Sequence, residues 1–436
     1  MAPVRSAPVK DSALPPVPRG RQALSQSLTS IVDQGWLSLL NLGLGLLLIR
    51  LATKDDYGLY SQLFVAGLFA TTVVEALVSS PLTTLASSAD ATLRESLIAD
   101  LSRLQQYLAQ ALALVMALAC AAVTGLATGT PPWVLSLCFG AYVYTYTQRE
   151  YKRTLDFIDG RPDRVLLLDG VYGLALIAGV SLLTLGNRIT LPGLFGLMAL
   201  ANLLALAGSP RRPRLSHQAD RYRKNLAAAW QRGRLALPGA LSSWVINYSY
   251  LYITALWLGT AAAADLQASR LLLMPLSLCV VAWARVACPM MGRLLHASQA
   301  GRLRQIIVHS AGVLEGLSIL YICLLWLMLP WLEAHVLGDN YRGLGPQVLA
   351  WGVYFMIYAA RWIGTALLMA GDQYRTLLIA AVASLALLLV SLSPLLAWFG
   401  TVGALIALSA AEILALLLLG RSIVVLSASS MPGLRQ

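Results

Sequence analysis

The feature that most constrains the fold of this chain is a series of continuous apolar runs. Residues 165–185, 307–330, 376–398 and 402–420 are examples. A helix of about 20 apolar residues spans the hydrocarbon core of a membrane, which is about 30 Å thick. Hydrocarbon offers no partner for backbone amides, so spanning segments are helices or closed barrels, and runs without two-residue alternation favour helices. The sequence therefore predicts an all-α integral membrane protein.

Composition supports this fold class, because 58% of the 436 residues are hydrophobic and only 12% are charged. A soluble domain of this size does not bury so large an apolar excess. We predict about twelve transmembrane helices. Their ranges are 29–49, 58–80, 107–126, 132–147, 165–185, 190–208, 237–258, 265–291, 307–330, 346–370, 376–398 and 402–420.

The positions of the basic residues predict the orientation of these spans. Most of the 32 Lys and Arg residues fall in the alternate connections that share one side of the membrane. The opposite side holds only Arg50, Lys54, Arg188 and Arg342. Basic residues accumulate on the cytoplasmic side, so both termini are expected there. This distribution accounts for the net charge of +12 without nucleic acid as a partner.

An internal repeat predicts two lobes. The segment that begins LATKDDYGLYSQL, residues 51–84, reappears in outline at 258–292, which begins LGTAAAADLQASRL. A parallel repeat of six plus six helices matches the twofold design of many secondary transporters. The predicted parts are a disordered cytoplasmic tail (1–28), an N-terminal six-helix lobe (29–208), a basic cytoplasmic linker held on the anionic leaflet (209–236), a C-terminal six-helix lobe (237–420) and a cytoplasmic tail (421–436).

Motifs for enzymatic chemistry are missing from the sequence. It has no G-x-x-x-x-G-K-[ST] phosphate loop, and it has no nucleophile motif, so no catalytic residue is predicted. The five cysteines lack C-x-x-C spacing and the four histidines lack metal spacing, so we expect no metal and no cofactor. Short external connections also argue against a membrane transferase or polymerase with a large periplasmic catalytic loop.

Charged residues inside the predicted spans are the candidate functional residues, because each costs at least about 2.5 kcal/mol at the bilayer centre without a partner or a cavity. They are Asp33, Glu75, Asp169, Arg270, Arg285, Glu315, Arg361 and Glu412. Asp33 and Asp169 lie close to the cytoplasmic ends of their spans, where we expect them to be hydrated. Arg361 and Glu412 lie near the middle of theirs.

Three arginines predict a cationic cavity. Arg270 and Arg285 are spaced to lie on one side of a helix, and Arg361 is placed at the membrane midplane. Guanidinium groups bind phosphate through a bidentate fork and are not neutralised by burial, which favours an anionic substrate.

The carboxylates leave alternatives open. Glu75, Glu315 and Glu412 are candidates for proton coupling or for ion pairing. In the alternative arrangement Arg361 pairs with Glu412, while Arg270 and Arg285 reach towards the two membrane surfaces, and the set is a static scaffold.

Four segments in order along the chain resemble a known family. They are LLLIRLATKDDYGLY (46–60), YTQREYKRTLDFIDGRPDRVLLLD (146–169), LQASRLLLMPLSLCVVAWARVACPMMGRL (266–294) and VLGDNYRGLGPQVLAWGVYFM (336–356). The set resembles the O-antigen and exopolysaccharide flippases of the multidrug/oligosaccharidyl-lipid/polysaccharide (MOP) superfamily.

The resemblance implies two six-helix lobes around a central cavity and export of undecaprenyl-pyrophosphate-linked oligosaccharide across a bacterial inner membrane by alternating access. The partners it implies are that substrate, membrane lipids, and the polymerase and chain-length machinery of polysaccharide assembly. The runner-up is an ion-coupled multidrug or small-solute antiporter on the same scaffold. A membrane scaffold that docks a synthase complex through its basic loops is a further alternative.

Overall fold

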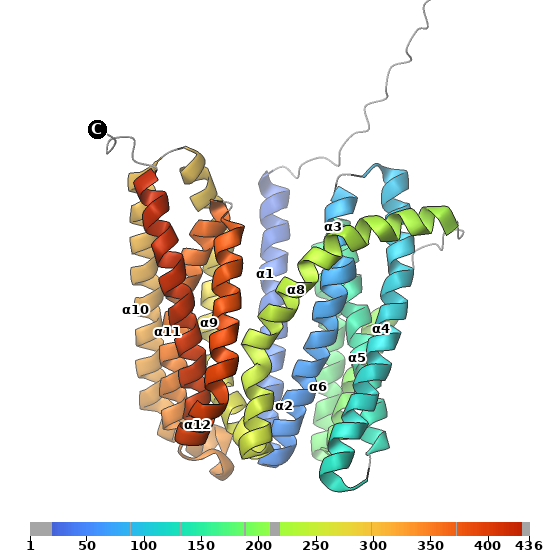
Figure 1. Ribbon diagram of the computed structural model, residues 1–436. Coiled ribbons are helices and arrows are strands. Elements are labelled where there is room, and N and C mark those ends of the chain that lie inside the picture. The colour runs from blue at the N-terminus through green and yellow to red at the C-terminus, as the bar shows by residue number, and fades with distance from the viewer. Residues whose placement is uncertain are drawn as a thin grey trace, which may run out of the picture. The chain divides into compact units, whose positions relative to one another are not determined.

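The protein is almost entirely helical in the computed structural model, which describes residues 20–87, 89–130, 132–186, 189–209, 219–297, 299–371 and 373–429 (Figure 1). Within these ranges eight helices are long and apolar enough to cross a membrane, and Leu191–Ala207 is a shorter apolar helix. The predicted all-α fold is confirmed. That the chain crosses the membrane twelve times stays a prediction.

Each predicted span overlaps a helix of the structure. The elements are α1 (Gly20–Leu51), α2 (Lys54–Val74), the π-helical η1 (Glu75–Ser79), α3 (Ser80–Ser87), α4 (Ala91–Thr128), α5 (Trp133–Ile158), α6 (Pro162–Leu185), α7 (Leu191–Ala207), α8 (Ala219–Leu258), α9 (Thr260–His296), α10 (Ala300–Leu332), the π-helical η2 (Glu333–Leu337), the 3-10 helix η3 (Asp339–Tyr341), α11 (Gly345–Ala370) and α12 (Tyr374–Ser429).

The long α12 contains the last two predicted spans and is interrupted between them. Gly400 has a φ of 58°, which is outside the helical region and which glycine adopts without steric cost. A Cβ on Gly403 would lie 1.9 Å from the carbonyl oxygen of Leu395. The two halves of α12 therefore approach each other too closely for a side chain at this position, and the glycines mark the break between the spans.

The chain forms two compact units. Unit 1 is Met1–Leu40 with Val73–Leu237, and unit 2 is Asn41–Thr72 with Pro238–Gln436. In unit 1, α5 packs against α4 and α7. One apolar core there contains Val74, Val78, Leu82, Leu97, Ile98, Leu101, Tyr151, Leu155 and Ala229.

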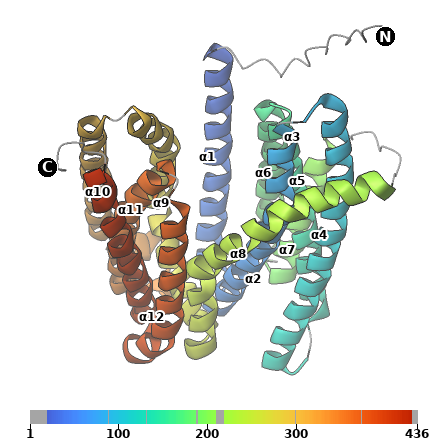
Figure 2. The ribbon, with the colours of Figure 1, turned by 45° about the horizontal axis from the view of Figure 1, so that its top comes forward.

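In unit 2, α11 packs against α9, α10 and α12, which lie side by side in both ribbon views (Figures 1 and 2). An apolar core of this unit contains Ala287, Met291, Leu314, Ile363, Ala366 and Leu367. The predicted lobe boundaries at 208 and 237 stay predictions.

The predicted basic linker is in large part a packed helix. Residues 210–218 lie outside the described residues, but 219–236 form the first half of α8. Arg221 lies 3.1 Å from a carboxylate oxygen of Asp100, and the Asn225 amide donates to Asp100 at 2.8 Å. Arg223 and Lys224 remain exposed, and their contact with the anionic leaflet stays a prediction.

Helices extend into both of the predicted tails. Helix α1 begins at Gly20, so residues 20–28, which we expected to be disordered, are helical. Helix α12 continues to Ser429, which includes half of the predicted C-terminal tail. Residues 1–19 and 430–436 lie outside the described residues, and the predictions made for them stay predictions.

The two copies of the predicted repeat meet at their first residues, within unit 2. Lys54, at the start of α2, lies 2.7 Å from a carboxylate oxygen of Asp265 in α9. The Thr260 hydroxyl donates a hydrogen bond to Asp55. A Cβ on Gly58 would lie 2.1 Å from the carbonyl oxygen of Thr260. The contact between α2 and α9 therefore requires glycine at this position.

We predict different effects on stability for two substitutions of glycine by alanine in unit 2. Gly58→Ala would force α2 away from α9, and we expect a lower unfolding temperature for the purified protein. Gly43 in α1 has no atom within 4 Å of a built Cβ. Gly43→Ala should raise the unfolding temperature or leave it unchanged, since alanine is favoured over glycine in a helix by about 1 kcal/mol. Equal shifts in the two variants would contradict the close approach.

Candidate functional site

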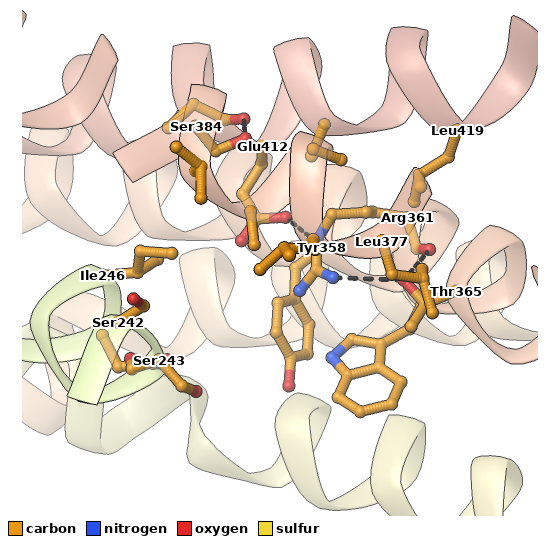
Figure 3. Close-up of a pocket in the computed structure, with 18 of the residues that line it drawn as sticks. Ser242, Ser243, Ile246, Tyr358, Arg361, Thr365, Leu377, Ser384, Glu412 and Leu419 are labelled. Carbon is orange, nitrogen blue, oxygen red and sulfur yellow. Dashed lines mark hydrogen bonds and ion pairs between the residues drawn. The ribbon is translucent and has the colours of Figure 1, made fainter. Parts of the chain in front are cut away.

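Unit 2 contains a pocket of about 280 Å³ among α8, α11 and α12 (Figure 3). Its walls combine apolar side chains with a small number of polar groups, as ligand pockets commonly do. The polar and aromatic residues that line it are Ser242, Ser243 and Asn247 on α8, Tyr358, Arg361, Trp362 and Thr365 on α11, and Ser384 and Glu412 on α12.

Arg361 and Glu412 form an ion pair in this pocket. The Arg361 Nε donates to Glu412 Oε2, and its Nη1 donates to the Thr365 hydroxyl at 3.3 Å. The exposed fractions of the two charged side chains are 20% and 8%. Among the described residues that line the pocket, these two alone are charged. The structure therefore brings together two of the residues singled out by their depth in the predicted spans.

An aromatic stripe runs along one face of α11. Its members are Trp351, Tyr354, Phe355, Tyr358 and Trp362, whose successive ring centroids lie 5.2–6.1 Å apart. Spacings of three and four residues place side chains on the same helical face. The stripe ends at the pocket, where the Arg361 guanidinium lies 5.4 Å from the Tyr358 ring and 5.7 Å from that of Trp362. These distances allow cation–π attraction.

Arg270, on α9, lies at the other end of the stripe. Its guanidinium is 5.4 Å from the Trp351 ring and donates to the Tyr250 hydroxyl at 2.9 Å. It also donates at 3.3 Å to the carbonyl of Asn247, a residue that lines the pocket. Arg270 is therefore one layer behind the pocket wall, in contact with aromatic rings.

The remaining candidates lie elsewhere. Arg285 and Glu75 have exposed side chains, and neither is among the residues that line the pocket. Glu315 is partly buried, and its Oε2 has no hydrogen-bond partner among the described residues. Of the three arginines that we expected to line one cavity, only Arg361 is among the described residues that line this pocket, and the cavity shared by all three stays a prediction. The predicted roles of Arg285, Glu75 and Glu315 stay predictions.

Unit 1 holds a buried charge network that the sequence analysis missed. Arg153, on α5, lies 3.0 Å from Asp33, 2.7 Å from Asp169 and 2.8 Å from Glu150. Arg149 adds a fourth contact, 3.6 Å from Asp169. Asp33 is 2% exposed and Asp169 is fully buried. Our expectation that these two aspartates are hydrated at the cytoplasmic surface is wrong, because arginines of a neighbouring helix cover them.

The network was missed because the end of a helix was misplaced. We predicted that the fourth span ends at residue 147, where the charged residues begin, whereas α5 continues to Ile158. Arg149 and Arg153 are four residues apart, so they lie on one face of this extended helix. Arg149 also stacks on Tyr172 of α6, 3.6 Å from the ring centroid. The four-residue spacing of the two arginines was the available signal.

We predict that Arg153→Met strongly destabilises the protein, by about 3–5 kcal/mol, because it leaves Asp33 and Asp169 buried without their shared partner. The matched control is Arg342→Met, since the ion pair of Arg342 with Asp339 is largely exposed. We expect little measurable change there. The stabilities of the two variants are compared by thermal or denaturant unfolding in lipid nanodiscs. If Arg153→Met unfolds under the same conditions as the wild type, the network contributes little to stability.

No protein-family profile matches this sequence, and no curated protein matches it. Solved structures do match its fold. An inward-facing multidrug resistance transporter of the MATE family, in the MOP superfamily, has a TM-score of 0.69 at 13% identity, with 90% of this chain and 96% of that chain covered. The lipid II flippase MurJ has a TM-score of 0.71 at 13% identity, covering 93% and 90%. This chain has the fold of MOP-superfamily transporters.

A third match is a MOP-superfamily transporter from Pyrococcus furiosus, described as having a binding pocket of reverse polarity. Its TM-score is 0.62 at 12% identity, with 97% of this chain and 99% of that chain covered. Two of these three proteins are described as transporters and one as a flippase. With eight helices of membrane-spanning length in its described part, this chain is a multi-pass membrane protein.

Proposed function

We propose that this protein is a flippase that moves undecaprenyl-pyrophosphate-linked oligosaccharide repeat units from the cytoplasmic to the periplasmic leaflet. Its product would feed the assembly of a surface polysaccharide, either exopolysaccharide or O-antigen. The observation that carries the proposal is the position of Arg361 in a pocket of unit 2 within a transporter fold. One solved protein with this fold, MurJ, is itself a lipid flippase.

The chemistry around Arg361 suits a pyrophosphate. The planar guanidinium presents several N–H donors in a fixed fork that matches phosphate oxygens. Tyr358 and Trp362 contact the cation, and Thr365 fixes one of its nitrogens. A donor group held in place in this manner loses little conformational freedom when it binds.

The rest of the pocket suits a sugar ring, which has both an apolar face and hydroxyl groups. Tyr358 and Trp362 offer rings that combine an apolar surface with a polar tip. Ser242 and Ser243 line the pocket from α8 (Figure 3) and offer hydroxyl donors and acceptors. The pocket therefore combines groups for the anionic part and the saccharide part of one ligand.

The proposed topology has twelve crossings in two six-helix lobes, with both termini cytoplasmic in a bacterial inner membrane. The asymmetry of Lys and Arg between alternate connections supports this orientation. The exposed basic residues Arg223 and Lys224 of α8 would then face the anionic leaflet. The polymerase and the chain-length machinery of polysaccharide assembly are the proposed protein partners.

We predict that Arg361→Ala abolishes polymer export. In a deletion strain complemented with this variant at wild-type abundance, surface polymer should be lost and lipid-linked precursor should accumulate on the cytoplasmic leaflet. The control is Arg302→Ala, which removes an exposed arginine of the same unit that is outside the pocket. If cells with Arg361→Ala have normal levels of polymer and precursor, Arg361 is not part of the transport site.

An ion-coupled multidrug or small-solute antiporter is the second candidate, and one observation favours it. Glu412 places a carboxylate in the pocket, and carboxylates suit cationic drugs. Two of the solved proteins with this fold are a multidrug resistance transporter and a flippase, so the fold is compatible with both functions.

We predict that cells that overproduce the wild-type protein gain no resistance to cationic dyes such as ethidium and show no faster dye efflux. The reason is that a cationic ligand would have to share the pocket with Arg361. Efflux that depends on the protein and is lost in Glu412→Gln would favour the antiporter instead.

A further inference from the structure

The groups that hold Arg361 come from two sources. Thr365, Tyr358 and Trp362 all belong to α11, the helix that carries the arginine itself. Glu412 is the one ion-pair partner of Arg361 in the described structure, and it belongs to α12. The guanidinium therefore has three contacts within its own helix in addition to the one with Glu412.

The contact with Glu412 occupies only part of the guanidinium. One hydrogen bond, from Nε to Oε2, joins the two groups. A guanidinium offers five N–H donors and accommodates a bidentate partner. The side chains of the pair line the pocket and point towards each other (Figure 3). A ligand in the pocket thus reaches the same cation that the carboxylate contacts.

The ion pair also neutralises the charge of Arg361 when the pocket holds no ligand. An arginine inside an apolar bundle is costly without a partner, and Glu412 supplies an anionic partner to Arg361 when no ligand is bound. A pyrophosphate carries more negative charge than a carboxylate and has more acceptor oxygens. It therefore competes with Glu412 for the guanidinium and forms stronger, charge-assisted hydrogen bonds.

We propose that Glu412 is a place-holder, meaning a carboxylate that occupies the anion position on Arg361 until the pyrophosphate of the transported molecule displaces it. This role rests on the proposed function, because a place-holder acts only if an anion enters the pocket. Exchange of one anionic partner for another keeps Arg361 neutralised in both states. It also weakens net binding, and a transporter must bind its ligand weakly enough to release it.

Displacement would also change the contact between two helices. Glu412 with Arg361 is the ion pair that joins α12 to α11 among the described residues. A bound pyrophosphate replaces this contact with one between α11 and the ligand. Ligand binding and the packing of α12 are then linked, and a ligand shifts a conformational equilibrium by its differential affinity for the two states.

The experiment measures binding of geranyl pyrophosphate to the full-length protein in phosphatidylcholine nanodiscs, by calorimetry. Glu412→Gln keeps the shape of the side chain but removes the competing charge, so we expect the affinity to rise about tenfold, which corresponds to about 1.4 kcal/mol. Glu412→Asp keeps the charge but shortens its reach, and its affinity should fall between those of the wild type and Glu412→Gln. If the Glu412 charge only repelled the ligand without exchanging with it, Glu412→Gln would raise the affinity but Glu412→Asp, which keeps the charge, would not.

The outcomes separate this inference from the proposed function. If both Glu412 variants bind as the wild type does or more weakly, while Arg361→Ala loses binding, the place-holder role is overturned and the flippase proposal stands. If Arg361→Ala binds as tightly as the wild type, the anion site itself is wrong and both proposals fail. Should Glu412→Gln not fold, Glu412→Asp alone decides, because its predicted affinity exceeds that of the wild type.

Discussion

The main constraint on this structure is that a charged side chain inside a helical membrane protein has to be kept away from hydrocarbon. Each such charge costs several kcal/mol unless it finds a partner or a cavity. The chain uses three arrangements. Arg361 takes a carboxylate from the next helix, Arg270 takes aromatic rings and a tyrosine hydroxyl, and Arg153 joins a network of three carboxylates.

These arrangements differ in what they allow the charge to do. In the unit 1 network the side chains of Arg149 and Asp169 are 4% and 0% exposed, and those of Arg153 and Glu150 are 15% and 29% exposed. The Arg361 side chain is 20% exposed and lines a pocket in unit 2. A charge that lines a pocket can exchange its partner for a ligand, whereas the fully buried Asp169 cannot. This difference is the physical basis for assigning transport to the pocket and stability to the network.

The sequence predicted the helices well and their ends less well. Continuous apolar runs specify helices because no other open structure satisfies the backbone in hydrocarbon. The end of α5 is not specified in this manner, because the carboxylates that pair with its arginines belong to other helices, Asp33 to α1 and Asp169 to α6. Depth alone picked out Arg361 and Glu412, and their pairing was one of the alternatives. The pocket around them was not predictable, because α8 supplies one wall.

A structure of the protein in nanodiscs with a bound prenyl-pyrophosphate-linked saccharide tests the central claim most directly. The account predicts the pyrophosphate within hydrogen-bond distance of Arg361, the saccharide against Tyr358 and Trp362, and Glu412 moved away from the guanidinium. Ligand bound elsewhere, with the Arg361–Glu412 pair intact, would contradict it.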